Sequence, residues 1–384
     1  MLYYLYGASL FSISIVPIKV YPFFFLSFNV IVLLNFLKNI DIDPLPSKVN
    51  PALAAFTLYL IYVLFVYAAK GGQTEFLLKI FINVGFLISS FAFIYDRIKN
   101  NLGLELARML TKILYFTLTI HFLQVLLCVF IGGLWLLPFK ISSSDDAYAI
   151  QEVGYLIFGD ENKNIWATKI LFFYLGFIYI SKLFKLETGT LVHILAIVSI
   201  VYTSSRTAQL GLILSFASYF IYIITLRIKQ NWAKFLLLFS LAVVIPIYLF
   251  EKISSIDLSS GHGGDGLLAR FFIWQFFLEN FSSFSNSELL FGHGIMSVAN
   301  FVGSVFPENN FHNVLLNQYF DLGLIGMLIY VYFFIYLAKS THKGFRLLII
   351  PGVFVASMSQ YFGYDAELMF AYSLAATSSL KEFN

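Results

Sequence analysis

Apolar stretches long enough to cross a lipid bilayer recur along almost the whole of this 384-residue chain. A membrane-spanning helix needs roughly 20 predominantly apolar residues. Hydrophobic residues make up 59% of the chain and charged residues only 12%, so little sequence is left for a separate water-soluble domain. The sequence therefore predicts one all-α, polytopic membrane domain that covers residues 1–384.

We expect about twelve transmembrane helices, an even number that places both termini on one side of the membrane. The expected spans are residues 3–18, 21–37, 51–69, 76–94, 113–134, 165–181, 189–203, 208–226, 235–250, 314–338, 347–360 and 368–380. The first run lacks the basic segment and the small-residue cleavage site of a signal peptide, so we interpret it as a retained span. The single cysteine, Cys128, excludes an internal disulfide and a cysteine-rich metal or redox site.

Basic residues gather in one of the two alternating sets of loops, which the positive-inside rule assigns to the cytoplasm. This set holds Lys38, Lys48, Arg97, Lys99, Arg108, Lys112, Lys182, Lys185, Arg227, Lys229, Lys234, Lys339, Lys343, Arg346 and Lys381. Acidic residues concentrate in two longer segments of the other set, residues 138–164 and 251–312. Both segments are therefore expected to be periplasmic loops, the larger one lying between the ninth and tenth spans.

Two arginines are expected at the outward membrane surface. Arg206 lies in the short connection "YTSSRTAQ" between the seventh and eighth spans, where a cation is costly without a partner and marks a candidate functional site. Arg270 begins "RFFIWQFFL", an almost wholly apolar segment expected to form a helix on the outer membrane face. Arg270 either extends its charge to lipid head groups or binds an anion there. His293, between two glycines, is expected to belong to a structural turn.

His312 and Asn313 stand just ahead of the tenth span, on the same outward side as the two arginines. Two arginines can hold a diphosphate through forked, charge-assisted hydrogen bonds. An imidazole that titrates near neutrality can accept the proton of an attacking hydroxyl. These groups suit glycosyl transfer from a lipid diphosphate. Asn317 and Asp321, four residues apart, are expected to share a helix face and to bond to each other or to a neighbour.

The motif that starts at His312 resembles the H-[NSQ]-x9-G-x-x-G signature of bacterial O-antigen ligases and O-antigen polymerases. Its glycines are Gly323 and Gly326, which we expect to allow close helix packing. Three further segments resemble the family in the expected order: "FGDENKNIWA", "SSRTAQL" and "ARFFIW…LLFGHG". The resemblance covers roughly residues 155–330, whereas the first 150 residues match only as membrane spans.

The resemblance implies an inverting, metal-independent membrane glycosyltransferase of the GT-C type, with no cofactor and no nucleic acid partner. Its donor would be a glycan linked to undecaprenyl diphosphate, used on the periplasmic face of the bacterial inner membrane for lipopolysaccharide or related polysaccharide biosynthesis. Arg206 and Arg270 would bind the diphosphate, His312 would orient or deprotonate the acceptor hydroxyl, and Asn313 would help position His312. Membrane lipids and a polysaccharide chain-length regulator are the other partners expected.

Polymerase, ligase and transporter remain as alternatives. We favour a polymerase, because the chain is short, rich in Phe and Tyr, and has no obvious basic surface on its outward loop for a phosphorylated lipid A-core. A ligase that transfers glycan to lipid A-core is the first alternative. A polysaccharide flippase is the second, although no internal repeat is visible in the sequence. A purely structural membrane protein ranks last, because it would not need Arg206 in a tight outward turn.

The charge asymmetry predicts the topology directly. A reporter fused after Ser260 should be active outside the cytoplasm, and one fused after Lys343 should be active inside, because the Lys/Arg bias sets the orientation. Alkaline phosphatase and fluorescent-protein fusions at the two positions measure this. The reverse pattern would contradict a periplasmic site.

Overall fold

The computed structural model describes residues 2–15, 21–38, 50–139, 148–158, 162–228, 266–306, 308–341, 346–359 and 361–377. Within these ranges the secondary structure is helical, apart from one isolated bridge between Gly72 and Ile295. The helices are α1 (Leu2–Ile15), α2 (Tyr21–Lys38), α3 (Asn50–Lys70), α4 (Thr74–Lys99), α5 (Gly103–Gly132), η1 (Leu137–Phe139), α6 (Ala149–Phe158), α7 (Lys163–Leu183), α8 (Thr190–Tyr202), α9 (Arg206–Arg227), α11 (Gly266–Asn280), η2 (Phe281–Ser283), α12 (Asn286–Phe291), α13 (Ser297–Gly303), α14 (Val314–Ser340), α15 (Arg346–Ser357) and α16 (Ala366–Thr377).

Six helices of the described chain are both long and apolar enough to cross a bilayer: α3, α4, α5, α7, α9 and α14. Shorter apolar helices lie at the other expected spans that the structure describes, in α1, α2, α8, α15 and α16. The all-α, multi-pass class is thus confirmed, while the count of twelve remains a prediction. The expected span at 235–250 lies outside the described residues. Within the expected loop 138–164, the structure adds a ten-residue apolar helix, α6, that packs on α5.

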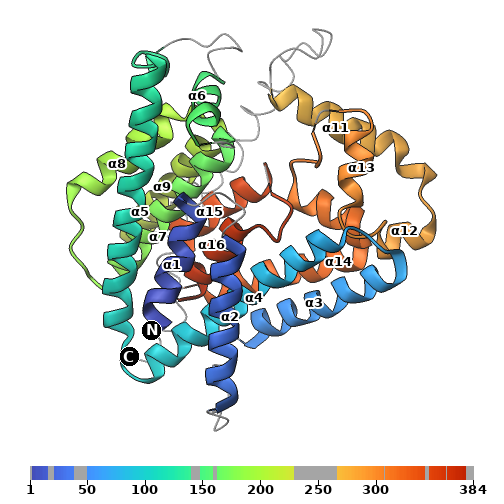
Figure 1. The fold of residues 1–384 in the computed structure, drawn as a ribbon, viewed down its shortest axis with the longest axis horizontal. Helices are drawn as coiled ribbons and strands as arrows, with labels where there is room; N and C mark the ends of the chain where they lie inside the picture. The colour runs from blue at the N-terminus through green and yellow to red at the C-terminus, as the bar shows by residue number, and fades with distance from the viewer. Residues whose placement is uncertain are drawn as a thin grey trace.

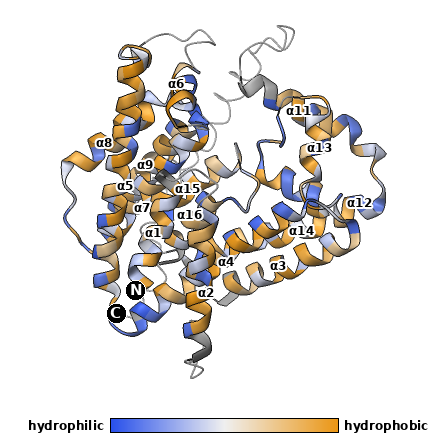
Figure 2. Cartoon of the chain, in the orientation of Figure 1, coloured by the Kyte–Doolittle hydropathy of each residue, from blue (hydrophilic) through white to orange (hydrophobic). Residues whose placement is uncertain are grey.

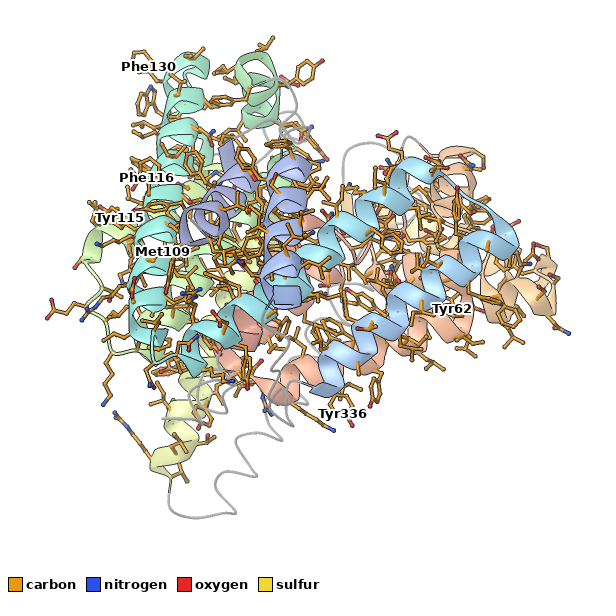
Figure 3. All side chains as sticks on the ribbon, turned by 60° about the horizontal axis from the view of Figure 1, so that its bottom comes forward. Tyr62, Met109, Tyr115, Phe116, Phe130 and Tyr336 are labelled. Atoms are coloured by element: carbon orange, nitrogen blue, oxygen red, sulfur yellow. The ribbon has the colours of Figure 1, made fainter. Side chains whose placement is uncertain are left out.

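The lateral surface of the bundle is apolar. Figure 2 shows hydrophobic residues along the lengths of the helices and hydrophilic ones mainly at their ends and in the turns. On α5 the side chains of Tyr115, Phe116 and Phe130 project outward (Figure 3), and Phe130 is 70% exposed. Such a surface is stable in contact with lipid tails but not with water.

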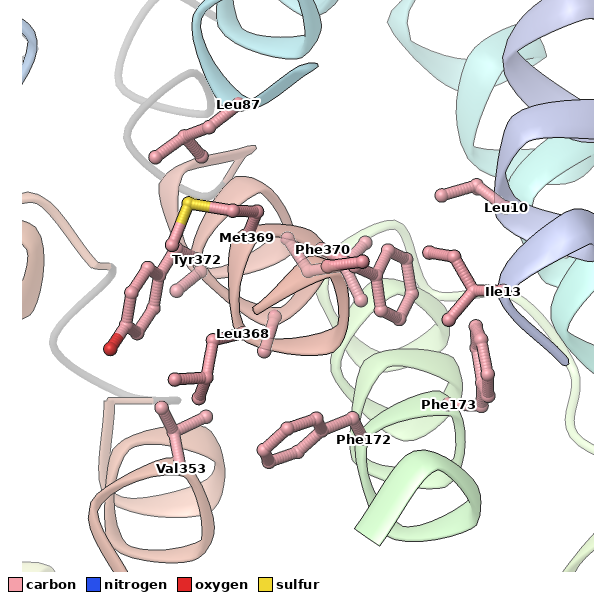
Figure 4. Packing of buried hydrophobic residues seen from close by; sticks show 14 of the residues in the cluster. Leu10, Ile13, Leu87, Phe172, Phe173, Val353, Leu368, Met369, Phe370 and Tyr372 are labelled. Atoms are coloured by element: carbon pink, nitrogen blue, oxygen red, sulfur yellow. The ribbon is translucent and has the colours of Figure 1, made fainter. Parts of the chain in front are cut away.

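Helix α7 forms the centre of the bundle, with most of its residues buried. It packs against α5, α8, α9, α15 and α16. Phe172 and Phe173 lie beside Leu368, Phe370 and Ile13 in the core (Figure 4). The helices α3 and α14 run side by side and are strongly inclined to α5 (Figure 1).

Helix α14 is broken at Gly323, whose backbone has φ 71° and ψ −174°. A break within a membrane-spanning helix frees carbonyl groups that must find other hydrogen-bond partners, because lipid offers none. The backbone carbonyl of Phe320 accepts from the N–H of His293 at 2.9 Å, and that of Asp321 accepts from the N–H of Gly294 at 3.1 Å. The carbonyl of Leu322 accepts from the hydroxyl of Tyr62 at 2.9 Å.

The break also brings two backbones into contact. A Cβ atom on Gly323 would lie 2.3 Å from the carbonyl oxygen of Leu290, and one on Gly292 would lie 2.2 Å from that of Asp321. Close packing, expected from the glycine spacing, is therefore present at Gly323. It joins α14 to the segment that follows α12 rather than only to another long helix.

Replacing Gly323 with Ala should destabilise the protein by about 3 kcal/mol, because the new methyl group meets backbone atoms and the left-handed φ strains any side chain. Thermal unfolding in detergent measures the loss. Gly189→Ala is the control, since nothing lies within 4 Å of its Cβ position and its φ is −67°. That control should cost no more than about 1 kcal/mol. Equal stability of the two variants would contradict the close contact.

Candidate functional site

His312 lies in the connection that enters α14, and its backbone adopts an unusual conformation. Its φ is +52°, in the left-handed region that side chains other than glycine rarely adopt. The N–H of His312 donates to Oδ1 of Asn310 at 2.6 Å. Asn313 caps α14, its Oδ1 accepting from the N–H groups of Leu315 (3.0 Å) and Leu316 (3.2 Å). His312 is therefore held between two asparagine turns.

Phe311, the residue before His312, is held by hydrogen bonds that link it to α11, to α14 and to the segment before α16. Trp274, on α11, donates its indole N–H to the carbonyl of Phe311 at 2.7 Å. The N–H of Phe311 donates to Oδ1 of Asn317 at 2.9 Å, and the amide nitrogen of Asn317 donates to the carbonyl of Tyr361 at 3.0 Å. A strained conformation persists only where its surroundings over-determine it, and these bonds do so.

Arg270 lies one turn before Trp274 on α11, and its charge acts on His312. Burial, with a smaller contribution from the nearby Arg270 guanidinium, lowers the pKa of His312 to about 4. The imidazole is therefore neutral at pH 7. Its Nδ1 atom is buried and has no hydrogen-bond partner among the described residues. A neutral ring with such an atom can accept a proton from a hydroxyl group.

An aromatic cluster holds α11 against the start of α14. Ile273 and Phe277 of α11 pack with Phe311, Phe320 and Val298, all fully or almost fully buried. The helix expected from residue 270 to 278 is present as Gly266–Asn280. It is anchored to protein through this cluster, which the apolar pattern of the segment did not reveal.

Asn317 and Asp321 each bond to a neighbouring segment, one of the two alternatives expected from the sequence. The carboxylate of Asp321 accepts from the backbone N–H groups of Met296 (3.0 Å) and Val298 (2.9 Å).

His293 stacks on Phe320 with ring centroids 4.1 Å apart, and its backbone N–H donates to the Phe320 carbonyl. His293 thus belongs to a structural turn, as expected.

Arg206 is the first residue of α9 and is exposed on the protein surface. The preceding Ser205 caps the helix, its hydroxyl accepting from the N–H of Ala208 at 3.5 Å. The charge of Arg206 acts on Lys163, the first residue of α7. The expected site residues therefore fall in two groups: Arg270, His312 and Asn313 around the entrance to α14, and Arg206 beside Lys163.

Lys163 and Trp274 have no role that the sequence pattern alone predicts. Lys163 could have been found as a lysine that lies just before the expected span 165–181 on its outward side, against the positive-inside trend. Trp274 ends "ARFFIW", part of one of the segments that resemble the family, but only the structure pairs its indole N–H with the carbonyl of Phe311. That contact joins positions 37 residues apart, which spacing alone does not predict.

Comparison with known families matches residues 191–331 to the family described as Wzy_C, O-antigen ligase. The matched segment covers less than half of the chain, from the start of α8 into α14, and contains Arg206, Arg270, His312 and Asn313. The match confirms the resemblance to the O-antigen ligase and polymerase family over this segment. The chain matches no protein among the curated ones compared.

The surroundings of His312 predict how it titrates. Its ring should remain neutral until the pH falls toward about 4, well below the ordinary histidine value of about 6.5. The contribution of the neutral His312 ring to the free energy of unfolding should be fully present above about pH 6.5 and be lost as the pH falls toward 4. Nitrogen-15 NMR of histidine-labelled protein, with His312→Gln for assignment, measures the midpoint. Arg270→Gln should raise that midpoint, and an unchanged value would contradict the proximity of the two groups.

Proposed function

We propose, from the premise that residues 191–331 carry the O-antigen ligase family segment, that this protein is a membrane glycan polymerase. It transfers a growing surface glycan from undecaprenyl diphosphate to a sugar hydroxyl of an incoming lipid-linked repeat unit. The reaction takes place at the periplasmic face of the bacterial inner membrane. The observation that supports this most is a neutral, buried imidazole beside an arginine at the entrance to a broken membrane helix.

The chemistry follows from these two side chains. The acceptor hydroxyl attacks C1 of the donor sugar and gives its proton to the imidazole of His312. The bond between C1 and the diphosphate oxygen breaks, and undecaprenyl diphosphate leaves with the electron pair. A single displacement of this kind inverts the configuration at C1. The guanidinium of Arg270 stabilises the negative charge that develops on the leaving diphosphate.

Donor binding also makes His312 a stronger base. Burial is the larger cause of the lowered pKa of His312, and the charge of Arg270 adds to it. A bound diphosphate offsets the contribution of Arg270, so the pKa of His312 rises and the ring becomes a stronger base. Arg206 binds the diphosphate from α9. The reaction needs no metal ion, because the arginine charges take the part that a cation would play.

An O-antigen ligase is the second candidate, favoured by the description of the matched family. It uses the same donor and the same groups, but its acceptor is lipid A-core. We favour the polymerase because the described part of the outward segment 266–306 carries one basic residue besides its histidine, Arg270. A phosphorylated core oligosaccharide would be bound better by a surface with more cations. A polysaccharide chain-length regulator is a further partner under this proposal.

Replacing His312 with Ala or Gln should lower the rate of glycan extension by about 100- to 10,000-fold while leaving donor binding largely intact. The assay uses purified protein, a defined undecaprenyl-diphosphate-linked repeat unit and mass spectrometry of the lengthened lipid-linked product. His293→Gln is the matched control: it removes another histidine, one that stacks on Phe320, so it should lower stability but retain most activity. A stable, fully active His312→Gln protein would remove this histidine from the mechanism.

A further inference from the structure

A non-helical segment, residues 361–365, leads into α16 and is almost wholly buried. In a membrane domain such backbone is tolerated where the protein itself satisfies its polar groups. The carboxylate of Asp365 accepts from two backbone N–H groups of the segment, at 2.8 Å and 3.0 Å. Asn83 of α4 donates its amide N–H to the carbonyl of Tyr364 at 2.9 Å. The segment is therefore held both by its own carboxylate and by a helix distant in the sequence.

Two neighbouring residues near the start of α14 attach that helix to this segment. Asn317 and Gln318 are each 1% exposed. Nδ2 of Asn317 donates to the carbonyl of Tyr361 at 3.0 Å, and Nε2 of Gln318 donates to the carbonyl of Phe362 at 2.7 Å. The two side chains thus make the same kind of contact with consecutive carbonyl groups.

The oxygen atoms of the two amides have different partners. Oδ1 of Asn317 accepts from the backbone N–H of Phe311 at 2.9 Å, next to His312. Oε1 of Gln318 accepts from the hydroxyl of Tyr59, on α3, at 2.8 Å. Of these two amides, the amide of Asn317 is the one that links the buried segment to the connection carrying His312.

We propose that Asn317 is a positioning residue, which sets the place of the His312 ring by holding the N–H of Phe311 against the segment 361–365. This inference rests on the proposed function, in which His312 is the base. His312 has a φ of +52°, so a loosened connection can relax toward an ordinary backbone conformation and move the ring. A base must lie within about 2.6–3.2 Å of the hydroxyl whose proton it accepts. A displacement of about 1 Å can lower a rate by about 100-fold.

The test compares Asn317→Leu with Gln318→Met in the glycan-extension assay. Leucine has nearly the shape of asparagine but neither donates nor accepts, so it releases the N–H of Phe311. Asn317→Leu should lower kcat by about 100-fold and leave KM for the lipid-linked repeat unit largely unchanged. Gln318→Met is the matched control, because it also removes one bond to the segment and one to another partner. It should lower the melting temperature by a similar amount but retain most of kcat.

A second measurement does not depend on activity. Nitrogen-15 NMR of histidine-labelled protein reports the surroundings of the His312 ring, with His312→Gln for assignment. Asn317→Leu should shift the ring signals of His312, whereas Gln318→Met should leave them in place. A purely structural role of the two amides would move these signals equally or not at all.

The outcomes separate the inference from the proposed function. A folded Asn317→Leu protein with wild-type kcat and unchanged His312 signals would overturn the inference alone, as would equal losses of kcat in Asn317→Leu and Gln318→Met. Asn317→Ala is a second variant, and the melting temperature shows whether each protein is folded. If both Asn317 variants are unfolded, the role of Asn317 is structural and the proposal fails. No glycan extension by the wild type would instead contradict the proposed function, while the NMR comparison would still show whether Asn317 acts on His312.

Discussion

A helix that breaks inside a membrane must find partners for its freed carbonyl groups within the protein. Helix α14 breaks at Gly323 and meets this requirement with the turn at His293 and Gly294 and with the hydroxyl of Tyr62. Only glycine fits the contact, because any Cβ atom there would meet the backbone of Leu290. The break therefore fixes the segment after α12 against α14, and the rest of the site is built on that junction.

A series of contacts connects the break at Gly323 to His312, the candidate catalytic residue. Asp321, just before the break, holds the first residues of α13, and α13 packs with α11 through the aromatic cluster. With α11 in place, Trp274 can bond to the carbonyl of Phe311, and Arg270 lies beside His312. The left-handed backbone of His312 is thus maintained by contacts with segments far apart in the sequence.

The sequence was sufficient for features that depend on local pattern. Apolar runs predicted the helical membrane class, and the segment from Arg270 predicted a helix that is present. The spacing of Gly323 and Gly326 predicted close packing but not a break, because the break depends on a segment about 30 residues earlier. The ten-residue α6 was missed because its apolar run is too short to be read as a span. Lys163 could not be paired with Arg206, since only the packing of α7 and α9 brings them together.

The central claim is that the broken entrance of α14 presents His312 and Arg270 to a lipid-linked donor. A cryo-electron microscopy structure of the protein with bound undecaprenyl diphosphate tests it most directly. The account predicts the diphosphate in contact with the guanidinium of Arg270, with the imidazole of His312 facing the phosphate oxygen that carries the sugar in the donor. A diphosphate bound at the opposite, Lys/Arg-rich end of the helices, with the surroundings of His312 unchanged, would contradict it.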